Sequence, residues 1–168
     1  MVEIRIDYEG QLRCANTHMP SSAKFSTDAP VDNNGRGESF SPTDLVATGL
    51  GSCMATVMGI AAKNKGVELR GMRVAVEKHM SEDLPRRIAK IKVEIFMPIP
   101  ENHPERRVLQ GAALSCPVQH SIHPDIEVDI KWHWQMAVPE TPPPVQRIVN
   151  DPPKDTSGGG GWLQKFGG

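Results

Sequence analysis

The hydrophobic pattern at the start of the chain has a period of two. Apolar residues alternate with charged residues at Val2, Ile4, Ile6 and Tyr8. This alternation predicts a half-buried β-strand. A Glu-Gly turn follows, and residues 11–17 and 23–28 can then supply two more short strands.

The same period returns later in the chain. Alternating runs at residues 72–76 and 91–97 are joined by a polar connector at residues 81–85, which predicts an antiparallel pair. Residues 126–134 alternate once more and predict a final strand.

Residues 41–66 do not alternate and predict one long helix. Ser41 suits the N-cap, and Asp44 completes a capping box three residues later. Gly66 can take the left-handed conformation that ends many helices. No charged residue stands between positions 45 and 62.

An uncharged run of this length nearly matches a bilayer, so a membrane span has to be weighed. Small residues and Met dominate the run, which favours the central helix of a packed domain instead. Gly49, Gly51 and Gly59 lower the helix propensity and permit close approach by another backbone. We therefore expect a buried helix in tight contact with a partner helix, and no membrane association.

A second helix is predicted from about residue 103 to residue 115, with Asn102 as its N-cap. Pro117 interrupts it directly after Cys116. Its predicted inner face consists of Val108, Ala112 and Ser115. The element order is then βββ-α-ββ-α-β without a repeating βαβ period, which indicates an α+β domain.

Composition limits the function. The chain has 168 residues and a net charge of −1, so no nucleic-acid partner is expected. The composition changes near position 138, which predicts one domain over residues 1–137 and a flexible, Pro- and Gly-rich tail over residues 138–168. Three cysteines and no apolar targeting segment at the start favour a reducing cytoplasm over a disulfide framework.

Two cysteines stand in notable contexts. Cys53 lies in the uncharged helix, in SPTDLVATGLGSCMATVM, and Cys116 lies in AALSCPVQHSI. The residues alone favour a small buried hydrophobe for Cys53. Both motifs together, in this order and on these elements, resemble the OsmC/Ohr family of thiol-dependent peroxidases over roughly residues 1–134.

The resemblance implies an OsmC-like fold and an intertwined homodimer, in which central helices are wrapped by antiparallel sheets. It implies that Cys53 attacks an organic hydroperoxide and that Cys116 resolves the sulfenic acid as an intrachain disulfide. A dithiol such as a dihydrolipoyl protein then restores both thiols. Because Pro117 places Cys116 at the end of a helix, we expect the two cysteines to join without dismantling the fold, with Cys116 as the partner that moves. No cofactor is implied.

A reactive thiolate needs a nearby cation, because Cys53 lies too deep in its helix for the N-terminal dipole to help much. The family takes an Arg from the N-terminal segment, and Arg13 and Arg36 are both candidates here. The family also has a Glu that orients this Arg, whereas the aligned position here is Thr43. Asp44 beside it suits helix capping better.

Two other interpretations remain. Cys116, His120 and His123 have spacings that a metal could use, but no paired C-x-x-C accompanies them, so no metal site is expected. The chain could also be a non-catalytic dimer that binds an apolar small molecule in its interface cleft. The absence of the orienting Glu favours this alternative.

Overall fold

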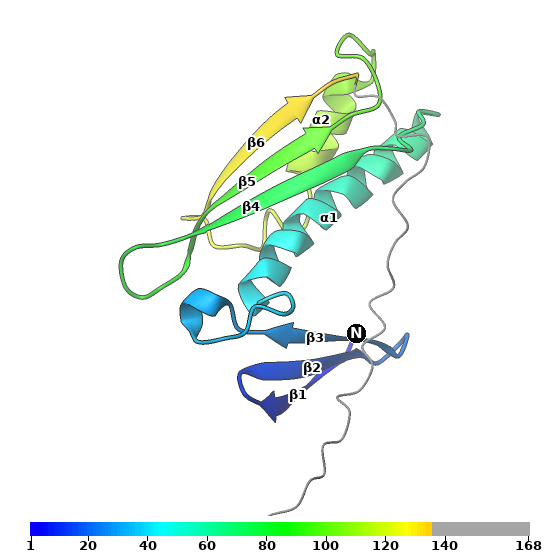
Figure 1. The fold of residues 1–168 in the computed structure, drawn as a ribbon. Coiled ribbons are helices and arrows are strands. Elements are labelled where there is room, and N and C mark those ends of the chain that lie inside the picture. The colour runs from blue at the N-terminus through cyan, green and yellow to red at the C-terminus, as the bar shows by residue number, and fades with distance from the viewer. Residues whose placement is uncertain (136–168) are drawn as a thin grey trace, which may run out of the picture.

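The computed structural model describes residues 1–135, and the predicted domain boundary and tail lie outside these residues. Six strands and two α-helices follow in the predicted order βββ-α-ββ-α-β, which confirms the α+β class (Figure 1). The elements are β1 (Ile4–Gly10), β2 (Arg13–His18), β3 (Ala23–Asp28), the 3-10 turn η1 (Val31–Asn33), α1 (Pro42–Asn64), β4 (Arg73–Met80), β5 (Ile88–Phe96), α2 (Arg106–Leu114) and β6 (Glu127–His133).

The first sheet is an antiparallel meander in the order β1-β2-β3, below the N-terminal end of α1 in Figure 1. Its first strand is not half-buried as predicted. Ile4, Ile6 and Tyr8 share one face of β1 and are 59%, 64% and 67% exposed. The alternation is correct, but none of the residues 1–135 covers the apolar face.

The second sheet has the order β4-β5-β6, and α1 and α2 lie on one face of it (Figure 1). The β4–β5 pair is antiparallel, as predicted. β6 runs parallel to β5, so β5, α2 and β6 form one βαβ crossover that the sequence pattern did not reveal. A single such unit produces no repeating period along the chain.

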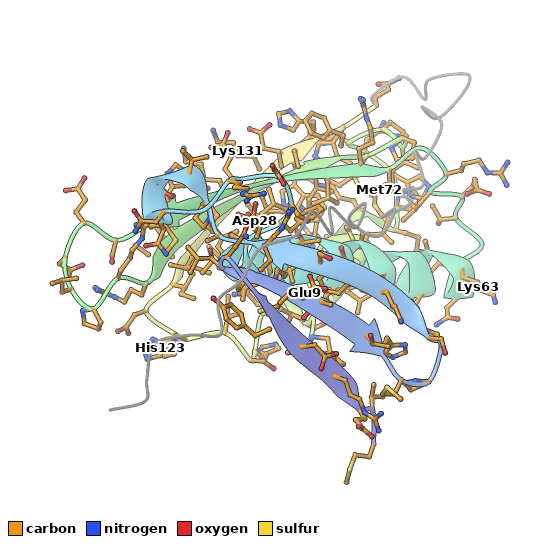
Figure 2. The ribbon with its side chains drawn as sticks, turned by 60° about the horizontal axis from the view of Figure 1, so that its bottom comes forward. Glu9, Asp28, Lys63, Met72, His123 and Lys131 are labelled. Carbon is orange, nitrogen blue, oxygen red and sulfur yellow. The ribbon has the colours of Figure 1, made fainter. Side chains whose placement is uncertain are left out.

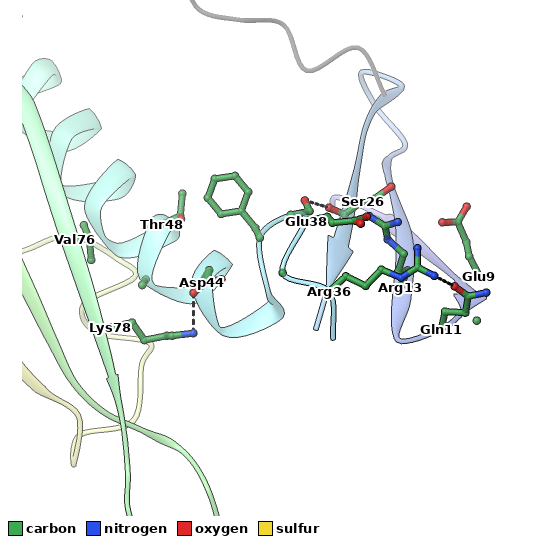
Figure 3. A pocket seen from close by; sticks show the side chains of 15 residues that line it. Glu9, Gln11, Arg13, Ser26, Arg36, Glu38, Asp44, Thr48, Val76 and Lys78 are labelled. Atoms are coloured by element: carbon green, nitrogen blue, oxygen red, sulfur yellow. Dashed lines mark hydrogen bonds and ion pairs between the residues drawn. The ribbon is translucent and has the colours of Figure 1, made fainter. Parts of the chain in front are cut away.

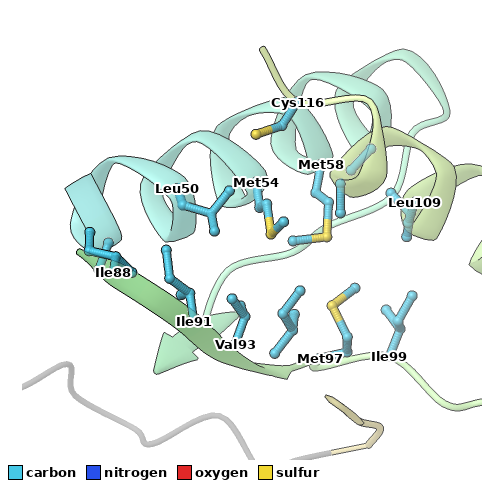
Figure 4. Packing of buried hydrophobic residues seen from close by; sticks show 14 residues of the cluster. Leu50, Met54, Met58, Ile88, Ile91, Val93, Met97, Ile99, Leu109 and Cys116 are labelled. Atoms are coloured by element: carbon cyan, nitrogen blue, oxygen red, sulfur yellow. The ribbon is translucent and has the colours of Figure 1, made fainter. Parts of the chain in front are cut away.

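Helix α1 begins and ends where the sequence predicts. The Ser41 side chain accepts from the backbone N–H of Asp44, and the Asp44 carboxylate accepts from the backbone N–H of Ser41 at 2.8 Å. Gly66 takes a positive φ of 66° after the last turn. One stripe of α1 packs against the second sheet (Figure 4), and its buried residues are Ala47, Leu50, Gly51, Met54, Met58 and Ala62.

The glycines of α1 have different surroundings within the chain, and the predicted tight contact with a partner helix of a second chain stays a prediction. A Cβ at Gly51 would lie 2.6 Å from Cγ2 of Val76, so this glycine admits strand β4. Cβ atoms at Gly49 and Gly59 would meet nothing within 4 Å. The close approach within the chain is thus between a helix and a strand, and two of the three glycines lie on an open face.

Helix α2 begins later than predicted. Its N-cap is Glu105, which makes no side-chain capping hydrogen bond, so the predicted cap at Asn102 is wrong. Leu109 and Ala113 enter the core, whereas Val108 is 42% exposed. The predicted inner face was therefore displaced by one residue, because packing on α1 and the core, which the local pattern does not encode, decides which side of α2 is buried.

By length and composition α1 could cross a membrane, with a mean hydropathy of 1.7 in its most apolar window. One third of that window is buried inside the chain itself. The buried stripe against the second sheet matches the interpretation of α1 as the central helix of a packed domain.

Candidate functional site

Cys53 lies on α1 at the border between its buried and open sides. It is partly exposed and packs against the edge of the core. Leu50, one turn earlier, is fully buried, whereas Val46 and Ile60 on the same side of the helix are 40% and 57% exposed. Cys53 is therefore not the fully buried hydrophobe that its neighbours suggested, and its thiol borders an open surface.

Cys116 follows the end of α2 and has no exposed surface. A turn over residues 117–122 encloses its sulfur, and the backbone N–H of Gln119 donates to Sγ at 3.3 Å. Burial raises the pKa of the Cys116 thiol, and its contact with the Cys53 thiol raises it further. The Gln119 N–H acts in the opposite direction, because it favours the anionic sulfur.

The structure thus brings the two thiols together. The Cys53 thiol lies near enough to Cys116 to raise the pKa of the Cys116 thiol, although 63 positions separate them in the chain. Figure 4 shows Cys116 beside α1, on the side of the helix away from β5. Both cysteines are reduced here, and disulfide formation requires two neighbouring thiols such as these, one on α1 and one just after the end of α2.

Arg13 belongs to a different part of the molecule, a cleft of about 980 Å³ between the first sheet and the start of α1 (Figure 3). Its guanidinium forms a 2.9 Å ion pair with Glu38. The carboxylate of Asp28 lies opposite Arg13 in the β2–β3 register. In Figure 2 Asp28 lies where the first sheet meets the rest of the chain, and Lys63 marks the far end of α1.

Asp28 is fully buried, and the loop after β3 folds around it. The backbone N–H of Glu38 donates to Oδ2 at 3.0 Å. This hydrogen bond is the largest cause that lowers the pKa of Asp28, and the charge of Arg13 lowers it as well, while burial opposes both. Arg13 therefore pairs with the Glu38 carboxylate and lies close enough to Asp28 for its charge to lower the pKa of that carboxyl.

Arg36 lines the same cleft and donates to the side-chain oxygen of Gln11. Cys53 is not among the residues that line this cleft. Within the part of the chain that the structure describes, Arg13 and Arg36 lie together but neither hydrogen-bonds to Cys53. The sequence-predicted site thus falls into two groups, a pair of thiols and a pair of arginines.

Sequence reasoning missed Lys78, which reaches from β4 to the start of α1. Its Nζ lies 2.7 Å from Oδ1 of Asp44 and donates to Oγ1 of Thr43 at 2.7 Å (Figure 3). The sequence held a signal for it, because Lys78 shares the inward face of β4 with Val74 and Val76. A charged residue on the apolar face of an alternating strand needs a partner, and Asp44 is that partner.

The role predicted for Asp44, helix capping, is confirmed, and the carboxylate also pairs with Lys78. Partial burial opposes its ionisation, but the hydrogen bonds from Lys78 and Ser41 outweigh burial and lower the pKa. Thr43, at the position where the family has its orienting Glu, accepts from Lys78 instead of holding an arginine.

Residues 1–135 contain no group of three or more His, Cys, Asp or Glu side chains placed to hold a metal ion. Cys14, the third cysteine, lies in β2 opposite Tyr8 and Thr27 and is partly buried. Cys14 therefore belongs to the first sheet, whereas Cys53 lies on α1 and Cys116 follows α2.

Two sheets, a long capped helix packed on one of them and two neighbouring thiols, one on α1 and one just after α2, are the features expected of an OsmC-like domain. The family model described as "OsmC-like protein" matches residues 35–131, which is more than half of the chain. The chain belongs to this family.

Solved structures agree with this assignment. A candidate osmotic stress induced and detoxification response protein from Psychrobacter arcticus 273-4 is 41% identical, with a TM-score of 0.75. The match covers 79% of this chain and 96% of that one. No sequence among curated proteins matches the chain.

More distant structures share the fold. One is an organic hydroperoxide resistance protein OsmC from Legionella pneumophila, with 15% identity and a TM-score of 0.65 over 79% of this chain and 96% of that chain. Another, a candidate organic hydroperoxide resistance protein from Vibrio cholerae, has captopril bound in one of its active sites. It has 15% identity and a TM-score of 0.64, over 79% of this chain and 90% of that chain.

Proposed function

We propose that this protein is a thiol-dependent peroxidase that reduces organic hydroperoxides, with Cys53 as the attacking cysteine and Cys116 as the resolving cysteine. The observation that carries the proposal is the contact between a partly exposed thiol on α1 and a fully buried thiol after α2. Membership of the OsmC-like family and the hydroperoxide resistance named for two structural relatives support it.

The chemistry has three steps. The Cys53 thiolate attacks one peroxide oxygen, the O–O bond breaks, and the sulfenic acid and an alcohol form once the alkoxide takes a proton. The Cys116 thiolate then attacks the sulfenic sulfur and releases hydroxide, which yields the Cys53–Cys116 disulfide. An external dithiol such as a dihydrolipoyl protein reduces this disulfide and is itself oxidised to a disulfide.

The activating cation in this proposal is Arg13. Glu38 holds its guanidinium in an ion pair and the charge of Asp28 lies nearby, whereas the Arg36 side chain pairs with the neutral Gln11 among the described residues. Since Arg13 does not reach Cys53 within one chain, we infer that the guanidinium arrives when two chains pack together.

A homodimer is supported by two uncovered apolar faces. One is the face of β1 that bears Ile4, Ile6 and Tyr8, and the other is the open side of α1 with Val46 and Ile60. Mutual burial of these faces would give the intertwined dimer that the resemblance implies. A cytoplasmic location is part of the proposal, because the reaction cycle needs a reducing environment.

One observation favours the alternative, a dimer that binds an apolar molecule. A small groove of about 340 Å³ lies between α1 and β4, and apolar side chains from Ala55, Met72, Val74 and Val76 line it. In this alternative the thiols are incidental.

Turnover of cumene hydroperoxide with dihydrolipoamide discriminates the two functions. Cys53→Ser should reduce turnover to the uncatalysed rate, while Cys14→Ser, the matched control, should leave it unchanged. Cys116→Ser should still consume one equivalent of peroxide and leave a sulfenic acid on Cys53 that dimedone traps. Full turnover by Cys53→Ser would rule out the proposed mechanism and leave the binding function.

A further inference from the structure

The two thiols differ sharply in access. Cys116 has no exposed surface, whereas Cys53 is partly exposed at the border of the open side of α1. Thiol–disulfide exchange is an in-line displacement, so the incoming sulfur must touch the attacked sulfur on the side opposite the departing one. Of the two cysteines in the described single chain, Cys53 is the one with exposed surface, at the border rather than the centre of the side of α1 that the proposed dimer covers.

The surroundings of Cys116 also suit a departing sulfur. The turn after α2 directs the backbone N–H of Gln119 at Sγ, at 3.3 Å, where it favours the anionic sulfur. A hydrogen bond from Ser121 Oγ to the Pro117 carbonyl, at 2.7 Å, closes the same turn. The Gln119 donor is part of the backbone and is already in place when negative charge develops on the sulfur.

We propose that external thiols reduce the Cys53–Cys116 disulfide by attack on Sγ of Cys53, with Cys116 as the leaving group. The incoming thiolate forms a bond to Sγ of Cys53, the Sγ–Sγ bond breaks, and its electron pair leaves on Cys116, which then takes up a proton. The second thiol of the dithiol attacks its own sulfur in the mixed disulfide and releases Cys53 as a thiolate. This sequence rests on the disulfide of the proposed function.

Burial of Cys116 works against its departure, since burial raises the pKa of that thiol and a weaker acid leaves more slowly. The accessibility of the two sulfurs nevertheless decides which one the external thiol attacks. Attack on Cys116 would require the turn over residues 117–122 to open first, whereas Cys53 already has exposed surface. The backbone N–H of Gln119 reduces the cost of the favoured route.

The test uses the full chain with Cys14→Ser, so that only the paired cysteines react. Diamide forms the disulfide without peroxide, and a limiting amount of the monothiol N-acetylcysteine then opens it. Acid quenching with N-ethylmaleimide traps the mixed disulfide for tryptic mapping. Cys53 falls in the peptide 37–63 and Cys116 in the peptide 108–131. The monothiol should be at least tenfold more abundant on the Cys53 peptide.

A second measurement does not depend on the disulfide. In the same background, the single thiol of the Cys116→Ser variant should react with 5,5′-dithiobis(2-nitrobenzoate) at least tenfold faster than that of the Cys53→Ser variant. The two rates should converge in guanidinium chloride, which shows that the folded structure causes the difference.

A monothiol found mainly on Cys116, an equal distribution, or a failure of diamide to form the disulfide would each overturn the inference. The result separates it from the proposed function. Loss of peroxide turnover with mapping to Cys53 would refute only the peroxidase, and normal turnover with mapping to Cys116 would refute only the direction of reduction.

Discussion

Gly51→Ala tests whether the packing of α1 on β4 sets the position of the helix that carries Cys53. The new Cβ would lie 2.6 Å from Cγ2 of Val76 and 3.3 Å from Cγ1 of Val74. Carbon atoms normally approach to about 3.5–4.0 Å, so the Val76 side chain would have to retreat by roughly 1 Å. A valine side chain is stiff, and its neighbours in the core leave little room.

The magnitude follows from two opposing terms. Replacing glycine in a helix interior gains about 1 kcal/mol of helix propensity. Overpacking a dense core costs about 1–3 kcal/mol. Gly51→Ala should therefore lower the free energy of unfolding by roughly 0–2 kcal/mol. The same substitution at Gly59, where a Cβ meets nothing within 4 Å, should not cost packing energy within the chain.

Urea denaturation at one fixed protein concentration measures both variants, because assembly would otherwise shift the midpoints. Val76→Ala removes the clashing methyl groups, so adding it to Gly51→Ala should recover roughly 1 kcal/mol of coupling in a double-mutant cycle. If Gly51→Ala stabilises the protein and shows no coupling to Val76→Ala, the helix does not pack on β4 in the way described.

Two further substitutions test the charged groups. Arg13→Gln should lower hydroperoxide turnover by roughly 10²-fold if the Arg13 guanidinium assists Cys53, whereas Arg36→Gln should change turnover by less than about threefold. Equal losses of turnover in the two variants would reject Arg13 as the activating cation. Asp44→Asn should cost about 1 kcal/mol at neutral pH, because it weakens the capping box and leaves Lys78 unpaired. Because the pKa of Asp44 is lowered from its usual value of 3.8, this contribution to stability is present above pH 3.8 and is lost as the pH falls through the lowered pKa. The stability of Asp44→Asn should therefore depend less on pH below about 4 than that of the unchanged protein. Parallel acid profiles of the two proteins in thermal unfolding would contradict this.

The sequence predicts those parts of the fold that arise from local patterns. The capping box at Ser41 and Asp44 is formed by neighbouring residues, and the alternation of β4 and β5 fixes their inward faces. Less could be predicted where distant segments meet. The spacing of Cys53 and Cys116 carries no information about their contact, and the resemblance alone suggested it.

The charged groups of the site illustrate the same limit. Lys78 was recognisable as an inward-facing charge, but its partner Asp44 lies 34 positions earlier and could not be identified from periodicity. Glu38 follows a glycine-rich loop, and nothing in its local sequence indicates a pairing with Arg13. Ion pairs between elements depend on tertiary arrangement, which the alternation of residues does not encode.

The uncovered face of β1 has a consequence for local stability. Strands β1, β2 and β3 pack mainly on one another, whereas β4, β5 and β6 share a core with both helices. A three-stranded meander without a covered apolar face opens at low free energy, so the first sheet should behave as a separate cooperative unit. Its backbone amides should exchange with solvent far sooner than those of β5, and their protection should increase with protein concentration while that of β5 does not. Arg13 lies in this sheet, so the fraction of molecules with a reactive Cys53 would depend on the fraction in which the first sheet is folded and in place.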